Sequence, residues 1–192
     1  EHFIFMEYFA IEDAEAFAGV HEILKERAAA GVEVRLFYDD VGSISFINTD
    51  FVDRMEADGI HCRVFNQLFL LFNMFMNHRD HRKMTIIDGK VAFTGGYNLA
   101  NEYFNITHPF GQWKDTGLML EGDAVKTFTL MFLQMWNIDE KKPVFEPWIS
   151  EGTHDPDLSD GFVIPYGDCP LDEDKVGEMV YIDILNRAVN YV

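Results

Sequence analysis

Residues 81–88 read His81-Arg82-Lys83-Met84-Thr85-Ile86-Ile87-Asp88, and a second short stretch follows soon after as Gly95-Gly96-Tyr97-Asn98. In an extended strand, side chains two positions apart project to the same face, so His81 and Lys83 can point into one site. A turn would bring Asn98 back beside them. An imidazole that can attack, together with an ammonium and an amide that can hold anionic oxygens, suits phosphoryl transfer.

The spacing of this stretch resembles the HxKxxxxD-x6-GGxN signature of the phospholipase D superfamily, with a match at each required position: His81, Lys83, Asp88, Gly95, Gly96 and Asn98. So many matching positions are far more specific than a lone glycine motif. Residues 32–43, 98–103, 113–116 and 121–125 are further similar to bacterial cardiolipin synthases, and the similarity extends over 7–136. The resemblance implies an α/β fold, a phospholipase D-like α/β/α sandwich with a mixed, mostly parallel central sheet and helices on both faces.

The resemblance also implies a mechanism. In the superfamily, one motif histidine attacks phosphorus and forms a phosphohistidine, while a second histidine, from another half, protonates the leaving alcohol and then activates the acceptor. In cardiolipin synthesis, a phosphatidyl group moves onto a second phosphatidylglycerol and glycerol leaves. His81 would be the nucleophile, with Lys83 and Asn98 holding the phosphoryl oxygens and no metal or cofactor. This chain carries one such motif where the family enzymes carry two, so we expect half an active site and an inactive fragment.

Three carboxylates near the motif have roles of their own. Asp88 is part of the motif, but Asp-Gly between two β-branched runs is a strong hairpin signal, so we expect a turn or structural role for it. The resemblance implies that Asp115 orients the imidazole from behind, and the alternative is a surface residue of a strand. Asp80 stands where synthases usually have asparagine. Because neighbouring strand residues face opposite ways, we expect little contact between Asp80 and His81.

The composition limits the choice of function. The chain has 192 residues and a net charge of −18. Nucleic-acid binders normally present a basic surface, so this charge argues against a nuclease. A local basic island nevertheless surrounds His81 and consists of Arg79, Arg82, Lys83 and Lys90. The two cysteines, Cys62 and Cys169, are too few for a disulfide framework and favour a cytosolic environment.

Hydrophobic patterns predict the order of the elements. Residues 2–9, 14–30 and 32–38 are predicted to form a strand, a helix and a strand, the unit of a parallel sheet. Asp39 and Asp40 follow at the carboxyl end of that strand, where open α/β sheets place their sites. We further predict a helix at 50–57, strands at 61–65 and 111–120, a hairpin at 85–93, and a helix after Asp123 as its cap.

The expected organisation has three parts. Residues 1–140 form a first phospholipase D-like half with the motif, 141–160 an acidic linker, and 161–192 the start of a second, truncated half. In this last part we predict a strand at 162–164 and a helix at 176–189. Residues 64–76 are apolar and rich in Phe and Met but too short to span a bilayer. They are either buried in the core or form a loop in contact with acyl chains.

The leading hypothesis is a phosphatidyltransferase of the cardiolipin synthase type. The resemblance implies as partners an anionic phospholipid (phosphatidylglycerol), a membrane surface, and a second motif-bearing half from a missing part of the chain or from a homodimer. We expect no nucleic acid as a partner, because the net charge of −18 argues against it. The expected location is the cytoplasmic face of the cell membrane, with a soluble fragment and an anchor elsewhere. The alternatives are a phospholipase D-type phosphodiesterase that uses water, a nuclease, and a catalytically silent half-domain.

Overall fold

The computed structural model describes residues 2–68, 77–149, 162–169 and 172–191. The chain divides into two units, Glu1–Gly161 and Phe162–Val192. The first unit contains all six strands and four of the five helices that the described residues form, and the second contains α5 (Val176–Arg187). The organisation into a first half, a linker and a second half stays a prediction.

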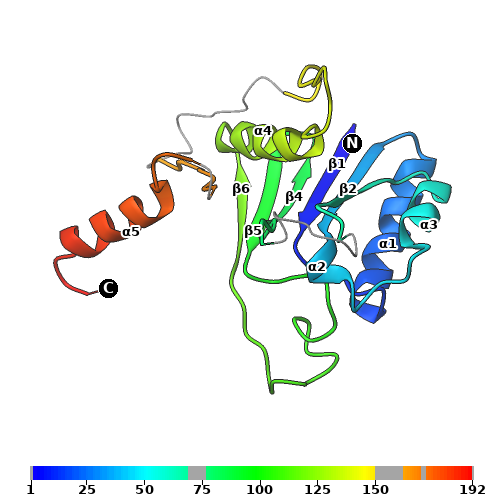
Figure 1. The fold of residues 1–192 in the computed structure, drawn as a ribbon, viewed down its shortest axis with the longest axis horizontal. Coiled ribbons are helices and arrows are strands. Elements are labelled where there is room, and N and C mark those ends of the chain that lie inside the picture. Colours follow the sequence, from blue (N-terminus) through cyan, green and yellow to red (C-terminus); the bar gives the residue numbers. More distant parts are fainter. Residues whose placement is uncertain (1, 69–76, 150–161, 170–171, 192) are drawn as a thin grey trace. The chain divides into compact units, whose positions relative to one another are not determined.

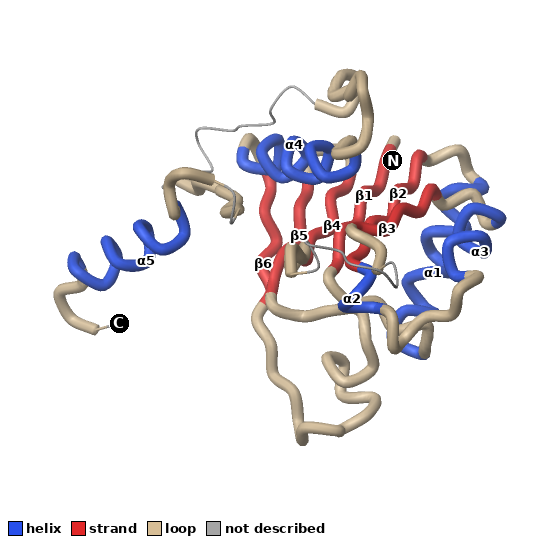
Figure 2. Tube along the Cα trace, in the orientation of Figure 1, coloured by secondary structure: helices blue, strands red, loops and turns tan. Residues whose placement is uncertain are grey.

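Six strands form one sheet in the order β3-β2-β1-β4-β5-β6 (Figure 2). Their bounds are β1 (Phe3–Tyr8), β2 (Glu33–Asp39), β3 (His61–Phe65), β4 (Lys83–Ile87), β5 (Val91–Gly95) and β6 (Gly117–Glu121). The pairs β1–β2 and β2–β3 are parallel, whereas β1–β4, β4–β5 and β5–β6 are antiparallel. The sheet is therefore mixed, as expected. The prediction that it is mostly parallel was wrong, because the three strand pairs that involve β4 to β6 are antiparallel.

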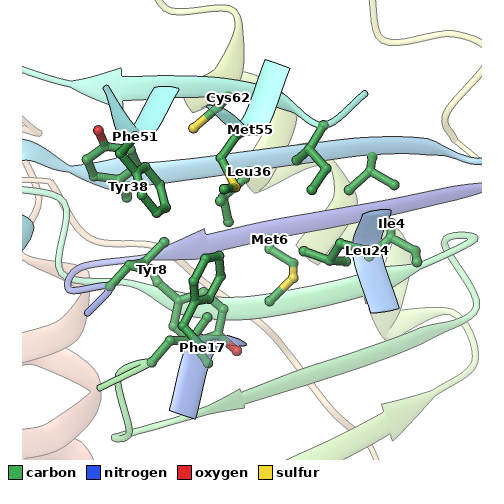
Figure 3. Close-up of a cluster of buried hydrophobic side chains, with 14 of the residues drawn as sticks. Ile4, Met6, Tyr8, Phe17, Leu24, Leu36, Tyr38, Phe51, Met55 and Cys62 are labelled. Atoms are coloured by element: carbon green, nitrogen blue, oxygen red, sulfur yellow. The ribbon is translucent and has the colours of Figure 1, made fainter. Parts of the chain in front are cut away.

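Helices cover both faces of this sheet, as the sequence predicted (Figure 1). The side chains of β1 alternate, so that Met6 and Tyr8 join the core under α1 (Glu15–Ala29) and α3 (Phe51–Ala57) (Figure 3). Phe3 and Phe5 point the other way and pack with α4 (Ala124–Trp136). This period-two alternation gives one strand two buried faces, which makes β1 the centre of the fold.

The predicted hairpin is present between β4 and β5. Its two turn residues, Asp88 and Gly89, have φ of 55° and 63°. Positive φ at both positions is the requirement of the two-residue turn that suits twisted strands, and Asp-Gly meets it at low cost. The turn returns the chain from the motif strand so that β5 lies directly beside β4.

Three local predictions were wrong. The strand expected at 111–120 starts only at Gly117, because the preceding residues form a loop held by two hydrogen bonds between Asn105 and Trp113. Asp123 precedes α4, but its side chain makes no capping hydrogen bond. Residues 162–164 form no strand, and Phe162 is fully exposed. The short helix α2 (Asp40–Ser43) was not predicted. Most of the apolar segment 64–76 lies outside the described residues.

Candidate active site

The motif histidine and lysine lie where β4 meets the carboxyl end of β1. Tyr8 pairs with Lys83 across the antiparallel ladder, so Phe9, the next residue, comes to lie beside the start of the motif strand. The ring centroid of Phe9 is 4.7 Å from that of His81, and Lys83 Nζ lies 5.2 Å from the same ring. Lys83 Nζ also donates a 2.8 Å hydrogen bond to the His81 carbonyl oxygen. One aromatic ring therefore contacts both motif residues.

The surroundings of His81 favour its neutral form. Partial burial and the positive charge of Lys83 lower the pKa of the imidazole, against the opposing charges of Asp80 and Asp39. A neutral imidazole has a free lone pair at neutral pH, and this lone pair is what attack on phosphorus requires.

Lys83 is almost completely buried, with 5% of its surface exposed. Burial lowers the pKa of its ammonium to about 8, while the charges of Asp80 and Asp115 act in the opposite direction. The ammonium remains mostly charged at neutral pH. A partly desolvated cation attracts an anionic oxygen more strongly than a cation in water, because little solvent screens the interaction.

Asn98 is the third motif residue at this place. Its Oδ1 accepts a 3.1 Å hydrogen bond from the backbone N–H of Ala10, the residue that follows Phe9. Its Nδ2 donates to the Tyr103 hydroxyl over 2.8 Å. The amide is buried and held by these two bonds, and its nitrogen has a second N–H that can donate to an anionic oxygen. Asn98 is thus linked to His81 and Lys83 through the residues that follow β1, because it bonds Ala10 while the other two contact Phe9.

Asp115 comes close to the glycine pair. A Cβ atom on Gly96 would lie only 2.4 Å from Asp115 Oδ1, so this glycine leaves room for the carboxylate. Asp115 accepts hydrogen bonds from the Trp113 indole at 3.1 Å and from the Thr116 backbone at 2.7 Å. Within the part of the chain that the structure describes, it makes no hydrogen bond to His81. An orienting role for Asp115 therefore stays a prediction, although its charge acts on Lys83.

Asp88 lies at the opposite end of β4 from His81. Its Oδ1 accepts hydrogen bonds from the backbone N–H groups of His2 at 2.5 Å and Phe3 at 2.9 Å. Burial acts to raise the pKa of this carboxyl, but the two backbone hydrogen bonds outweigh it and hold the pKa below its ordinary value. The structure thus separates Asp88 from the other motif residues and gives it the turn position that the Asp-Gly pair predicted.

This placement gives a first prediction. We expect Asp88→Ala to lower the free energy of unfolding by about 2 kcal/mol, because alanine is strained at positive φ and accepts neither hydrogen bond. Asp88→Asn, which tolerates the turn and keeps an acceptor, should cost less. Urea unfolding measures both effects. The contact between the Phe9 and His81 rings, followed by NMR, should be unchanged in either variant at a temperature where both are folded, and its loss in stable Asp88→Asn would contradict a purely structural role.

Some residues of the site were missed by sequence reasoning. Asp39, flagged only for its position, accepts hydrogen bonds from the Asp80 and Gly42 backbones at 2.9 and 3.1 Å and pairs with Arg79 at 3.3 Å. It therefore anchors the segment that leads into His81. Burial raises the pKa of Asp39, against those bonds and the charge of Arg79. Phe9 gave no signal, since its partner His81 is distant in sequence. Tyr103 lies in the stretch 98–103 that resembles the synthases, but its hydrogen bond to Asn98 was not predicted.

A hollow with a volume of about 390 Å³ lies beside Asp115 and is lined by residues that include Tyr97, Tyr103, Trp113 and Lys114. Its wall is largely aromatic, with one cation and one carboxylate.

Among the described residues, no group of three or more His, Cys, Asp or Glu side chains could hold a metal ion. None of the helices in the described part of the chain is long and apolar enough to cross a membrane.

Comparisons with known proteins relate the chain to one family. Residues 1–136 match the family model described as "Cardiolipin synthase, PLD-like domain". Over 192 residues the chain is 48% identical to an uncharacterized protein of Streptococcus mutans, covering 100% of this chain and 41% of that protein. Over 137 residues it is 39% identical to a cardiolipin synthase of Geobacillus kaustophilus, covering 71% of this chain and 27% of the synthase. The chain therefore spans less than half the length of these relatives.

A solved structure agrees with the fold. NucT from Helicobacter pylori superimposes with a TM-score of 0.51 at 14% identity, covering 71% of this chain and 80% of NucT. At such low identity the likeness concerns the fold alone. Because the family model covers most of the chain and includes the whole sheet with its motif strand, the chain belongs to the phospholipase D-like domain family of the cardiolipin synthases.

Proposed function

We propose that this chain supplies one half of the active site of a phosphatidyltransferase of the cardiolipin synthase type. The observation that carries the proposal is the grouping of His81, Lys83 and Asn98 around the end of β1. The pKa of the imidazole is lowered by burial and by Lys83, so the ring is neutral and nucleophilic at neutral pH. The buried ammonium and the amide stand ready for the oxygens of a phosphodiester.

The reaction would proceed in two displacements. An imidazole nitrogen of His81 attacks the phosphorus of phosphatidylglycerol, the bond from phosphorus to the glycerol headgroup breaks, and the departing oxygen takes a proton from a second histidine. In the second step, the hydroxyl of an acceptor phosphatidylglycerol gives its proton to that histidine. The oxygen of this acceptor hydroxyl then displaces His81 from phosphorus, and cardiolipin leaves. Lys83 and Asn98 would hold the non-bridging oxygens, whose negative charge is close to the cation in both steps.

The second histidine must come from outside this site. The sequence contains one HxKxxxxD motif, so the proposal needs a partner half, either in a longer polypeptide or in a second copy of this chain. A monomer of these residues alone would then be inactive.

We further propose contact with the cytoplasmic surface of a membrane. In support, the loop between β5 and β6 exposes Phe104, Ile106 and Phe110, the last of them to 76%, close to the Tyr103 that bonds Asn98.

The second prediction concerns the products. With vesicles of phosphatidylglycerol, the chain assembled with a second motif-bearing half should release cardiolipin and glycerol in equal amounts, measured by mass spectrometry of the lipids and an enzymatic glycerol assay. The monomeric chain, verified by sedimentation, serves as the inactive control. Phosphatidic acid in place of cardiolipin would identify water as the acceptor and make the enzyme a phosphodiesterase. Turnover by a strict monomer would overturn the two-histidine mechanism. If no assembled form turned over the lipid, the chain would instead be a catalytically silent half-domain.

A further inference from the structure

Two carboxyl side chains are buried next to the motif strand, on the side away from the nucleophile. Glu7 is fully buried and Asp80 is 4% exposed. Glu7 belongs to the set of β1 side chains that points toward α4, together with Phe3 and Phe5. The Arg82 guanidinium lies between the two carboxyls, with Nε 2.9 Å from Glu7 Oε1 and 3.0 Å from Asp80 Oδ1. This cluster takes no part in the phosphoryl transfer proposed above.

The charges in this cluster do not balance if both carboxyls are ionised. From α4, the Met131 carbonyl oxygen accepts a 3.4 Å bond from Arg82 and brings no charge. From the neighbouring loop, Arg79 is paired with Asp39, which also binds the Asp80 backbone. Lys83 points to the other face, toward Phe9, as does His81. Among the described residues, Arg82 is thus the one cation paired with both acids, and a second buried negative charge would be costly.

The hydrogen bonding of the cluster is also incomplete without one more proton. Within the described residues, Asp80 Oδ2 and Glu7 Oε2 accept no hydrogen bond from an N–H or O–H group, although both are fully buried. Burial and then the negative charge of Asp80 raise the pKa of Glu7 well above its ordinary value, and Arg82 only partly opposes this. A hydrogen bond between the two side chains, which a proton on one of them would make possible, acts in the same direction. A proton on one carboxyl would provide a donor and remove the excess charge.

We propose that Glu7 and Asp80 share one proton, and that this acid pair, clamped by Arg82, positions the segment that carries His81 and Lys83. Arg82 stands between those two residues in sequence, directly before β4 begins at Lys83, and successive side chains of an extended chain alternate. Holding Arg82 on the α4 side therefore directs both neighbours to the opposite face. The departure from asparagine at position 80 then has a physical meaning. An amide would donate an N–H to the Glu7 carboxylate, and the carboxyl of Asp80 needs a bound proton to achieve the same contact.

Infrared difference spectroscopy of the whole chain tests the shared proton directly. At neutral pH the unaltered protein should show the carbonyl band of one protonated carboxylic acid. Asp80→Asn and Glu7→Gln should each abolish this band while the protein stays folded, because an amide replaces the protonated acid. Absence of the band from the folded, unaltered protein at neutral pH would overturn the proposal. So would its persistence in both single variants, since the proton would then belong to another group.

The pH dependence of stability provides a second, independent readout. A raised pKa in the folded state means that the folded chain holds a proton that the unfolded chain has released, so this contribution to stability is complete below 4.5 and declines as the pH rises toward the raised pKa. Over this pH range we expect the free energy of unfolding to fall more steeply with pH in the unaltered protein than in Asp80→Asn. The difference in slope should correspond to about one proton. Identical slopes would contradict the shared proton.

The positioning role has its own control. His81 can be followed by NMR through its contact with the Phe9 ring, which shifts its resonances. Asp80→Asn should retain these shifts because the amide rescues the contact with Glu7, whereas Asp80→Ala should displace them. Equal spectra for Asp80→Asn and Asp80→Ala would show that the pair does not position His81. None of these readouts depends on catalytic turnover, so their failure is distinct from failure of the proposed transferase.

Discussion

Replacing His81 by alanine should abolish the covalent enzyme intermediate and reduce turnover by about 10³-fold or more in the assembled enzyme. The reason is that, in the proposed mechanism, the His81 imidazole forms the bond to phosphorus, and alanine has no group that can form it. Stability should change little, because His81 is exposed apart from its contact with Phe9.

The measurement is rapid quenching with phosphatidylglycerol that carries a labelled phosphate, followed by identification of the modified residue. The label should be stable to alkali and labile to acid, as expected for a phosphorus–nitrogen bond. His61→Gln is a matched control, since His61 is an exposed histidine on the edge strand β3. Label that remains in His81→Ala would assign the nucleophile to the partner half, and His81 would then be the general acid.

The second large effect is expected for Gly42→Ala, at a residue outside the motif. A Cβ atom here would lie 2.1 Å from the carbonyl oxygen and 2.8 Å from the carbonyl carbon of Phe9. These are backbone atoms, so the contact can be relieved only by moving the chain that carries the Phe9 ring, against which His81 and Lys83 rest. We expect a loss of about 3 kcal/mol in the free energy of unfolding, at the upper end for overpacking.

The helical residue Gly19 is the matched control for this prediction. It is exposed in α1, and a Cβ atom there would meet no other atom within 4 Å. Gly19→Ala should therefore stabilise the protein by up to about 1 kcal/mol through helix propensity. Urea midpoints with a constant slope compare the two variants. If both changed stability equally, the close approach between α2 and the end of β1 would be wrong.

Local patterns in the sequence predicted most of the elements and the placement of His81 and Lys83 side by side. The Asp88-Gly89 turn and the two-residue spacing of His81 and Lys83 are properties of short segments, so they could be recognised without a structure. Such patterns could not predict whether strands pair in parallel or antiparallel, because β4 pairs with β1 through contacts between residues far apart in the chain. The strand expected at 111–120 failed for a related reason, since the Asn105–Trp113 bonds hold its first half in a loop.

The candidate site was predicted in part for the same physical reason. The chemistry of His81, Lys83 and Asn98 is encoded in residue type and spacing, whereas the roles of Phe9, Asp39 and Glu7 depend on which strands are neighbours. Nothing in the pattern of 2–9 distinguishes Glu7 from a solvated residue of an edge strand. Only the burial on both faces of β1 reveals it as a partner of Arg82.

The antiparallel register of β1 and β4 has a further consequence for folding. Phe9 and His81 are about seventy residues apart, so the motif is local but the site is not. A β-hairpin such as β4–β5 forms within microseconds, whereas closing a long loop between distant strands carries a larger entropic cost and is slower. A peptide that contains only residues 81–98 would thus have the full signature but would lack the contact of His81 and Lys83 with Phe9. The candidate site is therefore complete only after β1 has paired with β4.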